Sequence, residues 1–324
     1  MARGPLRPRW RPTPEPGPGE VRLRISACGV CRTDLQLVEG DLALHRRPLV
    51  PGHQAVGRVE AVGPGVSGLA LGDRLGVGWL AGACGGCPAC RRGAENLCPR
   101  GTFTGWDRDG GYATHQVVAA DFTLPLPAAM ADEAVAPLLC AGIIGFRAWR
   151  LTGLSAGARL GLFGFGSSAH LVCQVARHAG CAVYVSSRGA AARARAERLG
   201  AAWVGGPGEQ PPVPLDAAIT FAPSGRVVVE ALVALDRGGI CVVNAIHLDG
   251  VPVLPYPLLY GERRLQSVAN YTRDDARAFL ALAARIPIVP EIETHPLAAA
   301  NQALQRLRAG AVEGSLVLSV GPSS

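Results

Sequence analysis

Between residue 20 and about residue 120, the chain alternates apolar and polar side chains in short runs. "EVRLRISA" at 20–27 and "AVGRVEAV" at 55–62 alternate at every second position, and "GYATHQVV" at 111–118 is also strand-like. A period of two places one face of a strand in a core, and glycine and proline punctuate the runs. This half of the chain is predicted to be a β-rich barrel or roll.

The pattern changes near Asp132. The stretch "ADEAVAPLLCAGIIGFRAWRL" at 131–151 is apolar at helical spacing, which predicts one long helix. Strand-like and helix-like runs then alternate, which predicts a doubly wound parallel sheet and an α/β fold class. Strands are expected at 158–166, 181–187, 215–222 and 238–246, with helices at 167–180, 190–200 and 225–235. The remaining residues contain two helix-like stretches and a last apolar strand, "SLVLSV".

Composition narrows the classes of function. The 324 residues exceed what one core usually serves, which favours two domains. The net charge of +7 comes entirely from arginine, spread along the chain. Biased arginine usage explains this charge more simply than a nucleic-acid partner does. The absence of lysine also excludes a Walker A loop, a Schiff-base lysine and a Tyr-x-x-x-Lys dehydrogenase.

The distribution of apolar residues bears on localisation. No uninterrupted apolar run approaches the ~20 residues of a membrane helix. The N-terminal "MARGPLRPRWRPTPEPGPGE" has no apolar core of the secretory kind. We therefore expect a cytoplasmic protein with no membrane partner. Ten cysteines are many for such a protein, and clustered cysteines there usually indicate metal or catalysis.

The strongest local signal is "CGGCPACRRGAENLC", which contains Cys84, Cys87, Cys90 and Cys98. Four thiolates at this spacing can wrap one tetrahedral ion, and glycine and proline supply the tight turns. Bacterial ferredoxins offer an alternative, since their last cysteine is also followed by proline, but their last gap is three residues rather than seven. We favour a structural zinc. Four cysteines fill its coordination sphere, so no position is left for a substrate.

A second set of possible ligands is scattered along the chain. A catalytic zinc takes three protein ligands and keeps one position open. Cys31, His53 and Cys140 would form such a set. Each alone has an ordinary interpretation, His53 as a loop histidine and Cys140 as a small core residue of an apolar helix. The sequence spacing of the three residues does not show that they meet at one site.

A third signal is "GLFGFGSSAH", in which Gly164, Gly166 and Ala169 form G-x-G-x-x-A between a strand and a helix. The first glycine permits the turn, and the second lets the backbone approach a pyrophosphate. In this context the motif predicts dinucleotide binding. An NAD site would place an acid after the second strand, but Ser187 and Arg188 stand there, which favours NADP and leaves NAD as the alternative.

Taken together, these motifs resemble the zinc-dependent medium-chain alcohol dehydrogenases over nearly the whole chain. The order and spacing match at "PEPGPGEVRLRI", "CGVCRTD", "PLVPGHQAVGRVEAVGPGV", the four-cysteine segment, "PLLCAG" and "GFGSSAH". The resemblance implies a GroES-like catalytic domain at 1–140, with the structural zinc lobe at 84–98. It further implies a Rossmann domain at 141–270 and a segment at 271–324 that returns to the catalytic domain.

The resemblance also assigns roles to residues. It makes Cys31, His53 and Cys140 the catalytic zinc ligands, giving two zinc ions per chain. Thr33 would bind the substrate oxygen and accept its proton, Asp34 would orient a ligand, and Arg32 would approach the cofactor pyrophosphate. Trp79, Leu80 and Trp106 flank these segments and either line an apolar pocket or belong to the core.

The activity implied is hydride transfer between NADP or NAD and a small or medium apolar alcohol or aldehyde. The implied assembly is a homodimer or homotetramer. Three alternatives stay open: a polyol dehydrogenase of the same family, a dinucleotide-binding sensor with reduced catalysis and, more distantly, a zinc-ribbon nucleic-acid protein.

Three departures from the family pattern motivate the sensor alternative. Gln36 stands where many members have an outer proton-relay histidine, so the relay must end in water or another group. Gln54 replaces the usual glutamate after the histidine ligand. The N-terminus is short and rich in arginine and proline, so either the family's first strand is missing or the start of the chain is set wrongly.

Overall fold

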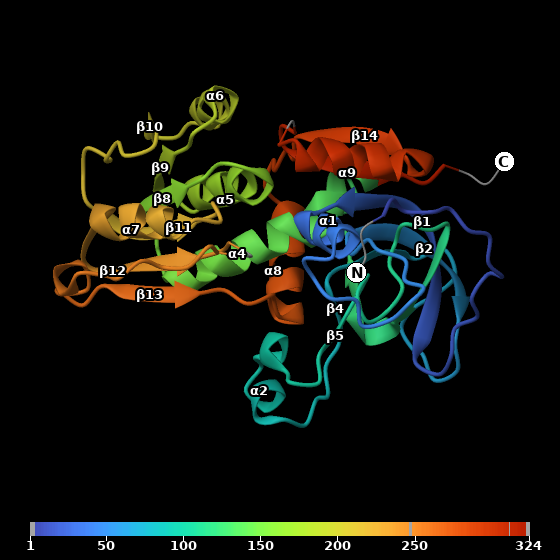
Figure 1. Cartoon of the computed structure of the whole chain (residues 1–324). Helices are drawn as coiled ribbons and strands as arrows, with labels where there is room; N and C mark the ends of the chain where they lie inside the picture. Colours follow the sequence, from blue (N-terminus) through green and yellow to red (C-terminus); the bar gives the residue numbers. More distant parts are fainter. Residues whose placement is uncertain (1–3, 246–247, 311, 322–324) are drawn as a thin grey trace. The chain divides into compact units, whose positions relative to one another are not determined.

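The computed structural model describes residues 4–245, 248–310 and 312–321. The chain forms two compact units: unit 1 combines Met1–Ile143 with Asn270–Ser324, and unit 2 is Ile144–Ala269 (Figure 1). The first unit boundary follows residue 143, where the prediction from sequence placed it after 140. The second follows residue 269, where the prediction from sequence placed it after 270.

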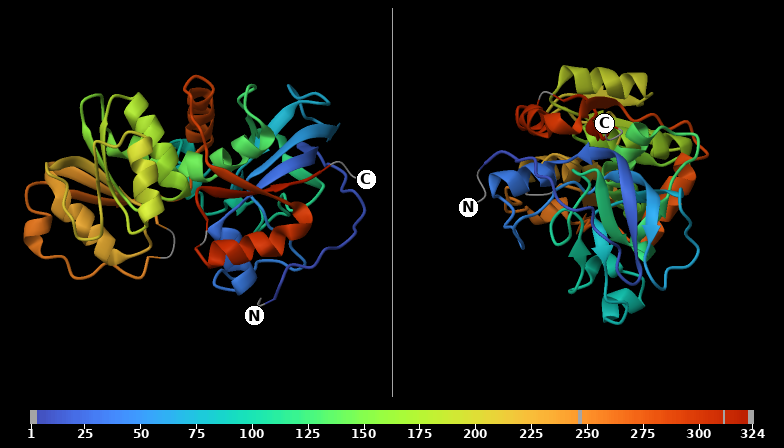
Figure 2. Two further views of the ribbon diagram at one scale, coloured as in Figure 1. Left: turned by 90° about the horizontal axis from the view of Figure 1, so that it is seen from above. Right: turned by 90° about the vertical axis from the view of Figure 1, so that its right-hand side faces the viewer.

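Unit 1 is built on a mixed sheet in the order β14-β15-β1-β2-β3-β7, and β6 also pairs with β1. The C-terminal β15 runs antiparallel to β1, and Figure 2 shows this red strand beside the blue N-terminal strands. Val21, Leu23 and Ile25 of β1 are buried, as their alternation predicts. The strands are β1 Glu20–Val30, β2 Ala55–Val62, β3 Arg74–Val77, β6 His115–Ala119, β7 Thr123–Pro125, β14 Ile292–Pro296 and β15 Ser315–Ser319.

Short elements complete unit 1. A two-stranded sheet pairs β4 (Leu80–Gly82) with β5 (Thr102–Phe103). Residues 4–19 contain no strand, and Leu6 instead exchanges hydrogen bonds with the Asn301 side chain. The helices are α1 Arg32–Glu39, α2 Pro88–Arg91, η1 Glu95–Leu97, η2 Ala120–Phe122, α3 Asp132–Val135, η3 Ala136–Leu139, α8 Arg273–Ala283, η5 Leu297–Ala299 and α9 Ala300–Arg308.

The prediction of a single helix at 131–151 is wrong. The structure divides it into α3, η3 and α4 (Ala141–Thr152), because Pro137 has no N–H for an α-helical bond. Cys140 stands at the break with φ −131° and ψ −72°, so it is not a helical core residue. Within the described part of the chain, no single helix is long and apolar enough to cross a membrane. The pair 132–139 and 141–152 meets that test only jointly, with a 44° bend.

Unit 2 is a six-stranded parallel sheet in the order β10-β9-β8-β11-β12-β13. The order reverses between β8 and β11, which is the arrangement of a Rossmann fold with its ligand site at the reversal. The elements are β8 Arg159–Phe163, α5 Ser167–His178, β9 Ala182–Ser186, α6 Ala190–Arg198, β10 Trp203–Gly205, β11 Leu215–Thr220, α7 Gly225–Ala234, β12 Leu235–Val243, η4 Tyr256–Leu258 and β13 Arg264–Ser267.

Two strands of this sheet were not predicted. β10 has only three residues, and all four residues of β13 are exposed, so neither carries an apolar alternation. The strand expected at 238–246 begins earlier, at Leu235, and residue 246 lies outside the described residues.

Helices cover both faces of the parallel sheet. One core joins Leu160, Leu162 and Val183 to α5 and α6, and the other joins Phe163 and Cys241 to α7. This two-sided burial explains why the strands read as nearly continuous apolar runs.

Val228 and Val233 on α7 provide a matched test of this packing. Val228 is fully buried, whereas Val233 is 50% exposed. Val228→Ala should lower the free energy of unfolding by about 2 kcal/mol, since two buried methyl groups are lost and a cavity forms. Val233→Ala, with the same helix propensity change, should alter it by less than about 0.5 kcal/mol. Urea unfolding followed by circular dichroism measures both, and equal losses would contradict the assigned packing.

Candidate functional site

The side chain of Asp34 lies at the centre of the first cluster. β1 ends at Val30 and α1 begins at Arg32, so Cys31 is the N-cap residue. The fully buried Asp34 carboxylate accepts hydrogen bonds from the backbone N–H of Cys31 at 2.9 Å and of Gly52 at 3.0 Å. One buried acid thus fixes the start of α1 against the loop that precedes β2.

Cys31, His53 and Cys140 come together around this carboxylate. Their ligand atoms all lie within 4.8 Å of one another, although the three residues come from distant parts of unit 1. His53 is 1% exposed, and its Nδ1 lies 3.3 Å from Asp34 Oδ1. That contact lacks hydrogen-bond geometry, which leaves Nδ1 without a hydrogen-bond partner among the described residues. The break at Cys140 brings its thiol to the other two ligands.

The ionisable groups in this cluster shift one another's pKa values. A hydrogen bond from Cys140 lowers the pKa of Cys31 well below its usual value, and the same bond raises the pKa of Cys140. Burial opposes protonation of His53, but attraction to Asp34 and Cys31 outweighs it and raises the pKa of His53 to about 10. Anionic sulfur is therefore held next to a buried acid, which favours a cation at this place.

The donor set fits zinc. Two thiolate sulfurs and one imidazole nitrogen are ligands that zinc prefers, and three protein ligands leave one position of a tetrahedron open. The Asp34 carboxylate beside His53 matches the carboxylate–histidine arrangement that orients metal ligands. A closed structural site would instead need a fourth protein ligand.

The other residues expected here take up different positions. Thr33 is buried, and its Oγ1 lies 3.9 Å from Cys31 Sγ. Arg32 is exposed at the first position of α1. Gln36 is buried, and its Oε1 has no hydrogen-bond partner among the described residues. The side chain of Gln54 fills the space beside Gly29, where a Cβ atom would lie only 2.8 Å from the amide carbon.

An aromatic face adjoins His53. Trp79 and His53 form a T-shaped pair with ring centroids 4.9 Å apart, and Trp79 stacks on Phe103 at 5.1 Å and on Trp106 at 5.9 Å. His45 continues the stack at 3.9 Å from Trp106. These rings are half-buried or exposed, whereas Leu80 is 3% exposed and belongs to the core. Trp79 and Trp106 are therefore available to an apolar ligand, and Leu80 is not.

Tyr112 was not identified from the sequence. Its hydroxyl donates to Asp34 Oδ2 at 3.3 Å, and burial raises its pKa, so the phenol stays protonated. Its ring packs so closely on Gly52, which has a φ of +97°, that a Cβ at this position would clash with the ring. The glycine before His53 was a signal for such a close approach.

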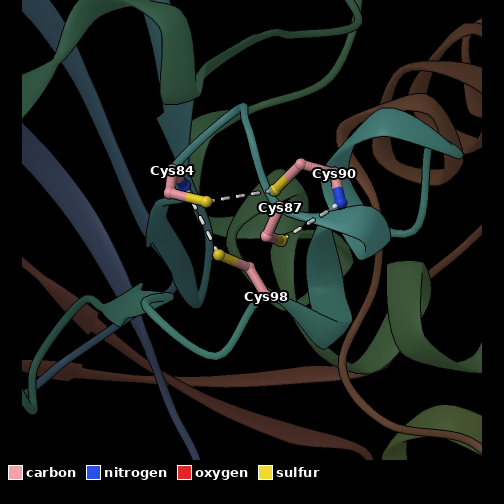
Figure 3. A group of neighbouring side chains, drawn as sticks. All are labelled: Cys84, Cys87, Cys90 and Cys98. Carbon is pink, nitrogen blue, oxygen red and sulfur yellow. Dashed lines mark hydrogen bonds between the residues drawn. The ribbon is translucent and has the colours of Figure 1, made fainter.

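The four-cysteine segment forms a separate lobe (Figure 3). The sulfurs of Cys84, Cys87, Cys90 and Cys98 lie within 4.8 Å of one another and point toward a common centre. Cys84 Sγ and Cys90 Sγ are 3.9 Å apart, and the backbone N–H of Cys90 donates to Cys87 Sγ at 3.4 Å. Four sulfurs around one point match a closed tetrahedral zinc site.

Two arginines outside the motif support this lobe. A hydrogen bond from Arg100 lowers the pKa of Cys84 to about 5, which stabilises the thiolate. Arg273 at the start of α8 pairs with Glu95 at 2.7 Å, and its backbone N–H donates to the same carboxylate at 2.8 Å. The sequence separation of 178 residues hid this second contact.

In unit 2 the glycine motif lies at the topological switch point. Gly164 has a φ of +93°, a conformation that favours glycine, and its N–H donates to Ser186 O at 2.8 Å. A Cβ at Gly166 would meet nothing within 4 Å, so the backbone is open at the start of α5. Ala169 is fully buried, as close packing of helix on strand requires. This open turn at a helix N-terminus fits a diphosphate.

Ser187 and Arg188 follow β9 on the same side of the sheet. The Ser187 N–H donates to Gly205 O at 3.0 Å, which anchors the loop to β10. Arg188 is exposed. Its guanidinium is thus free to meet an anionic group of a bound dinucleotide.

Known proteins are similar to this chain in both sequence and fold. The GroES-like domain of alcohol dehydrogenases matches residues 17–128. The chain is 49% identical to a protein of Mycobacterium tuberculosis named "Probable alcohol dehydrogenase AdhA", covering 99% of this chain and 94% of that protein. A cobalt- and zinc-bound alcohol dehydrogenase from Pyrobaculum aerophilum superposes with a TM-score of 0.85 at 28% identity, covering 96% and 94% of the two chains.

A second structure, from Sinorhizobium meliloti 1021, is assigned as a zinc-binding dehydrogenase and is bound to NADP. It matches with a TM-score of 0.85 and 26% identity over 95% of this chain and 94% of that one. The matched length, the fold and the two cysteine clusters agree with one another. This chain belongs to the zinc-dependent medium-chain alcohol dehydrogenase family, and it is an NAD(P)-dependent alcohol dehydrogenase.

Proposed function

We propose that this enzyme holds two zinc ions and uses NADP to oxidise small or medium apolar alcohols, or to reduce the corresponding aldehydes. The observation that carries the proposal is the Cys31, His53 and Cys140 cluster beside the buried Thr33 hydroxyl. The cobalt- and zinc-bound relative and the NADP-bound relative support the choice of metal and cofactor.

The residues of unit 1 have distinct tasks in this reaction. A zinc ion held by the cluster would supply Lewis-acid chemistry toward an alcohol or carbonyl oxygen, and NADP would supply hydride exchange. Thr33 accepts the alcohol proton at Oγ1. Asp34 keeps His53 in one orientation. Gln36 does not titrate, so the proton that leaves Thr33 passes to water or to another group.

The aromatic face favours apolar substrates. Trp79 and Trp106 present ring surface near His53, and such surface gains from contact with alkyl or planar groups rather than with several hydroxyls. This argues against the polyol alternative. Arg188 after β9 favours the 2′-phosphate of NADP, since no acid stands there to bind a ribose hydroxyl.

We also infer a cytoplasmic homodimer or homotetramer without a nucleic-acid partner. The ten free cysteines suit a reducing compartment, and the scattered arginines form no run typical of nucleic-acid binding.

Thr33 provides the direct test of activity. We expect NADP-linked turnover of aliphatic and benzylic primary alcohols and much weaker turnover of sorbitol. Thr33→Val should lower kcat/KM by about 100-fold or more, because the isosteric side chain has no hydroxyl to accept the proton. Thr33→Ser is the matched control and should retain most activity. Steady-state kinetics decides, and cofactor binding without turnover of any alcohol would establish the sensor alternative instead.

Metal content tests the two zinc sites. We expect about two zinc ions per chain in the wild type and about one in Cys98→Ser, with a lower melting temperature because the lobe loses its cross-link. Cys241→Ala removes a core cysteine outside both clusters and should keep two. Elemental analysis of purified protein measures this. Iron with sulfide in the wild type, or two zinc ions in Cys98→Ser, would refute the assignment.

Cofactor choice is tested at Arg188. Arg188→Ala should weaken NADPH binding by about tenfold, the loss of one charge-assisted contact, and change NADH binding by less than about twofold. Arg198→Gln, an exposed site on α6, controls for the change in net charge. Fluorescence titration gives both dissociation constants. A wild type that prefers NADH, or equal losses for both cofactors, would contradict the NADP assignment.

A further inference from the structure

Arg195 on α6 is 4% exposed, which is unusual for an arginine. α6 packs against α5, β9 and β10 (Figure 1). Burying a guanidinium is costly unless the charge makes compensating contacts. The contacts of Arg195 therefore show what the buried charge does.

Arg195 reaches the glycine turn. Its Nη2 donates to the carbonyl oxygen of Phe165 at 2.6 Å, and its guanidinium carbon lies 5.6 Å from the centre of the Phe165 ring. Phe165 is the residue between Gly164 and Gly166, and it is itself 4% exposed. The arginine thus holds the middle peptide of the turn from the side of α6.

The peptide geometry gives this contact a consequence. In a trans peptide the carbonyl oxygen and the following N–H point in opposite directions. Because Arg195 holds the Phe165 carbonyl on its own side, the Gly166 N–H is turned away from Arg195. Gly166 is the N-cap residue of α5, and the space at its Cβ position is open. This N–H therefore points to the side where it can join the other amides of the helix start in stabilising a diphosphate.

α6 restrains the neighbouring loop in the same manner. Arg193 Nη1 donates to Ser187 O at 2.9 Å and to Arg188 O at 2.8 Å. One helix thus ties down carbonyls from both loops that follow β8 and β9. Arg188 is left to meet the ligand, whereas Arg193 and Arg195 contact the protein backbone.

We propose that Arg195 is a positioning residue for the cofactor diphosphate, acting through the Phe165 carbonyl and adding a fixed positive charge beneath the glycine turn. The inference rests on the proposed NAD(P) binding at this turn. Because the diphosphate is common to both cofactors, Arg195 supports NADH and NADPH equally and plays no part in choosing between them.

The test compares ligands that do and do not contain the diphosphate. Arg195→Met removes the donor and the charge but keeps most of the volume. It should weaken ADP, NADH and NADPH binding by the same factor, about tenfold to 100-fold, as expected for a charged hydrogen bond. Adenosine, which has no phosphate, should bind within about twofold of its wild-type affinity. Calorimetry on the zinc-loaded protein measures all four.

Arg198→Gln is the control for net charge, because Arg198 is an exposed residue of the same helix. It should leave all four affinities unchanged. If Arg195→Met fails to fold, as judged by circular dichroism and zinc content, Arg195→Gln replaces it, and its shorter, uncharged amide should cost at least about fivefold for ADP.

The outcomes separate this inference from the proposed function. Unchanged ADP affinity in a folded variant would overturn the role of Arg195 while leaving cofactor binding intact. A loss confined to NADPH would overturn it too, since Arg195 would then contact the 2′-phosphate. Failure of the wild type to bind either cofactor would instead overturn the proposed function.

Discussion

The buried carboxylate of Asp34 is the interaction on which the catalytic unit depends. An ionised acid without exposure is stable only when donors surround it. Two backbone N–H groups and the Tyr112 hydroxyl supply them, and His53 lies beside the same group. Meeting this requirement fixes the start of α1 and the loop before β2 relative to each other. Cys31 and His53 are thereby held with their ligand atoms within 4.8 Å of each other.

Unit 2 uses the opposite charge for an analogous purpose. In unit 1 a buried anion orients the residues around a cation site. In unit 2 the buried guanidinium of Arg195 orients the backbone around an anion site, through its bond to the Phe165 carbonyl. In both units the buried charged side chain contacts groups of the ligand site and not the ligand itself. Preorganisation of this kind lowers the reorganisation needed when ligand binds.

Local patterns predicted the parts of this protein that local forces determine. Four strands of the parallel sheet, the glycine turn and the four-cysteine segment each show a pattern within a short stretch of sequence. The catalytic cluster depends on contacts between distant parts of unit 1. Sequence spacing therefore did not predict it, and only the family resemblance grouped its three residues. The prediction of one helix over 131–151 was wrong. The apolar positions there have helical spacing, but Pro137 interrupts the α-helical hydrogen bonds. That proline is the reason Cys140 leaves the helix and reaches the other ligands.

The two glutamines that depart from the family pattern bear on the charge at the site. Two thiolates balance the charge of a zinc ion, and Asp34 adds one negative charge beside His53. A carboxylate at position 54, next to His53 in the chain, would add another negative charge, worth on the order of 1–3 kcal/mol at an intermediate dielectric if it lay about 5 Å away. Gln54 adds none, and neither does the buried Gln36. Neutral amides at these positions therefore leave the centre less negative, which favours negative charge developing on the substrate oxygen.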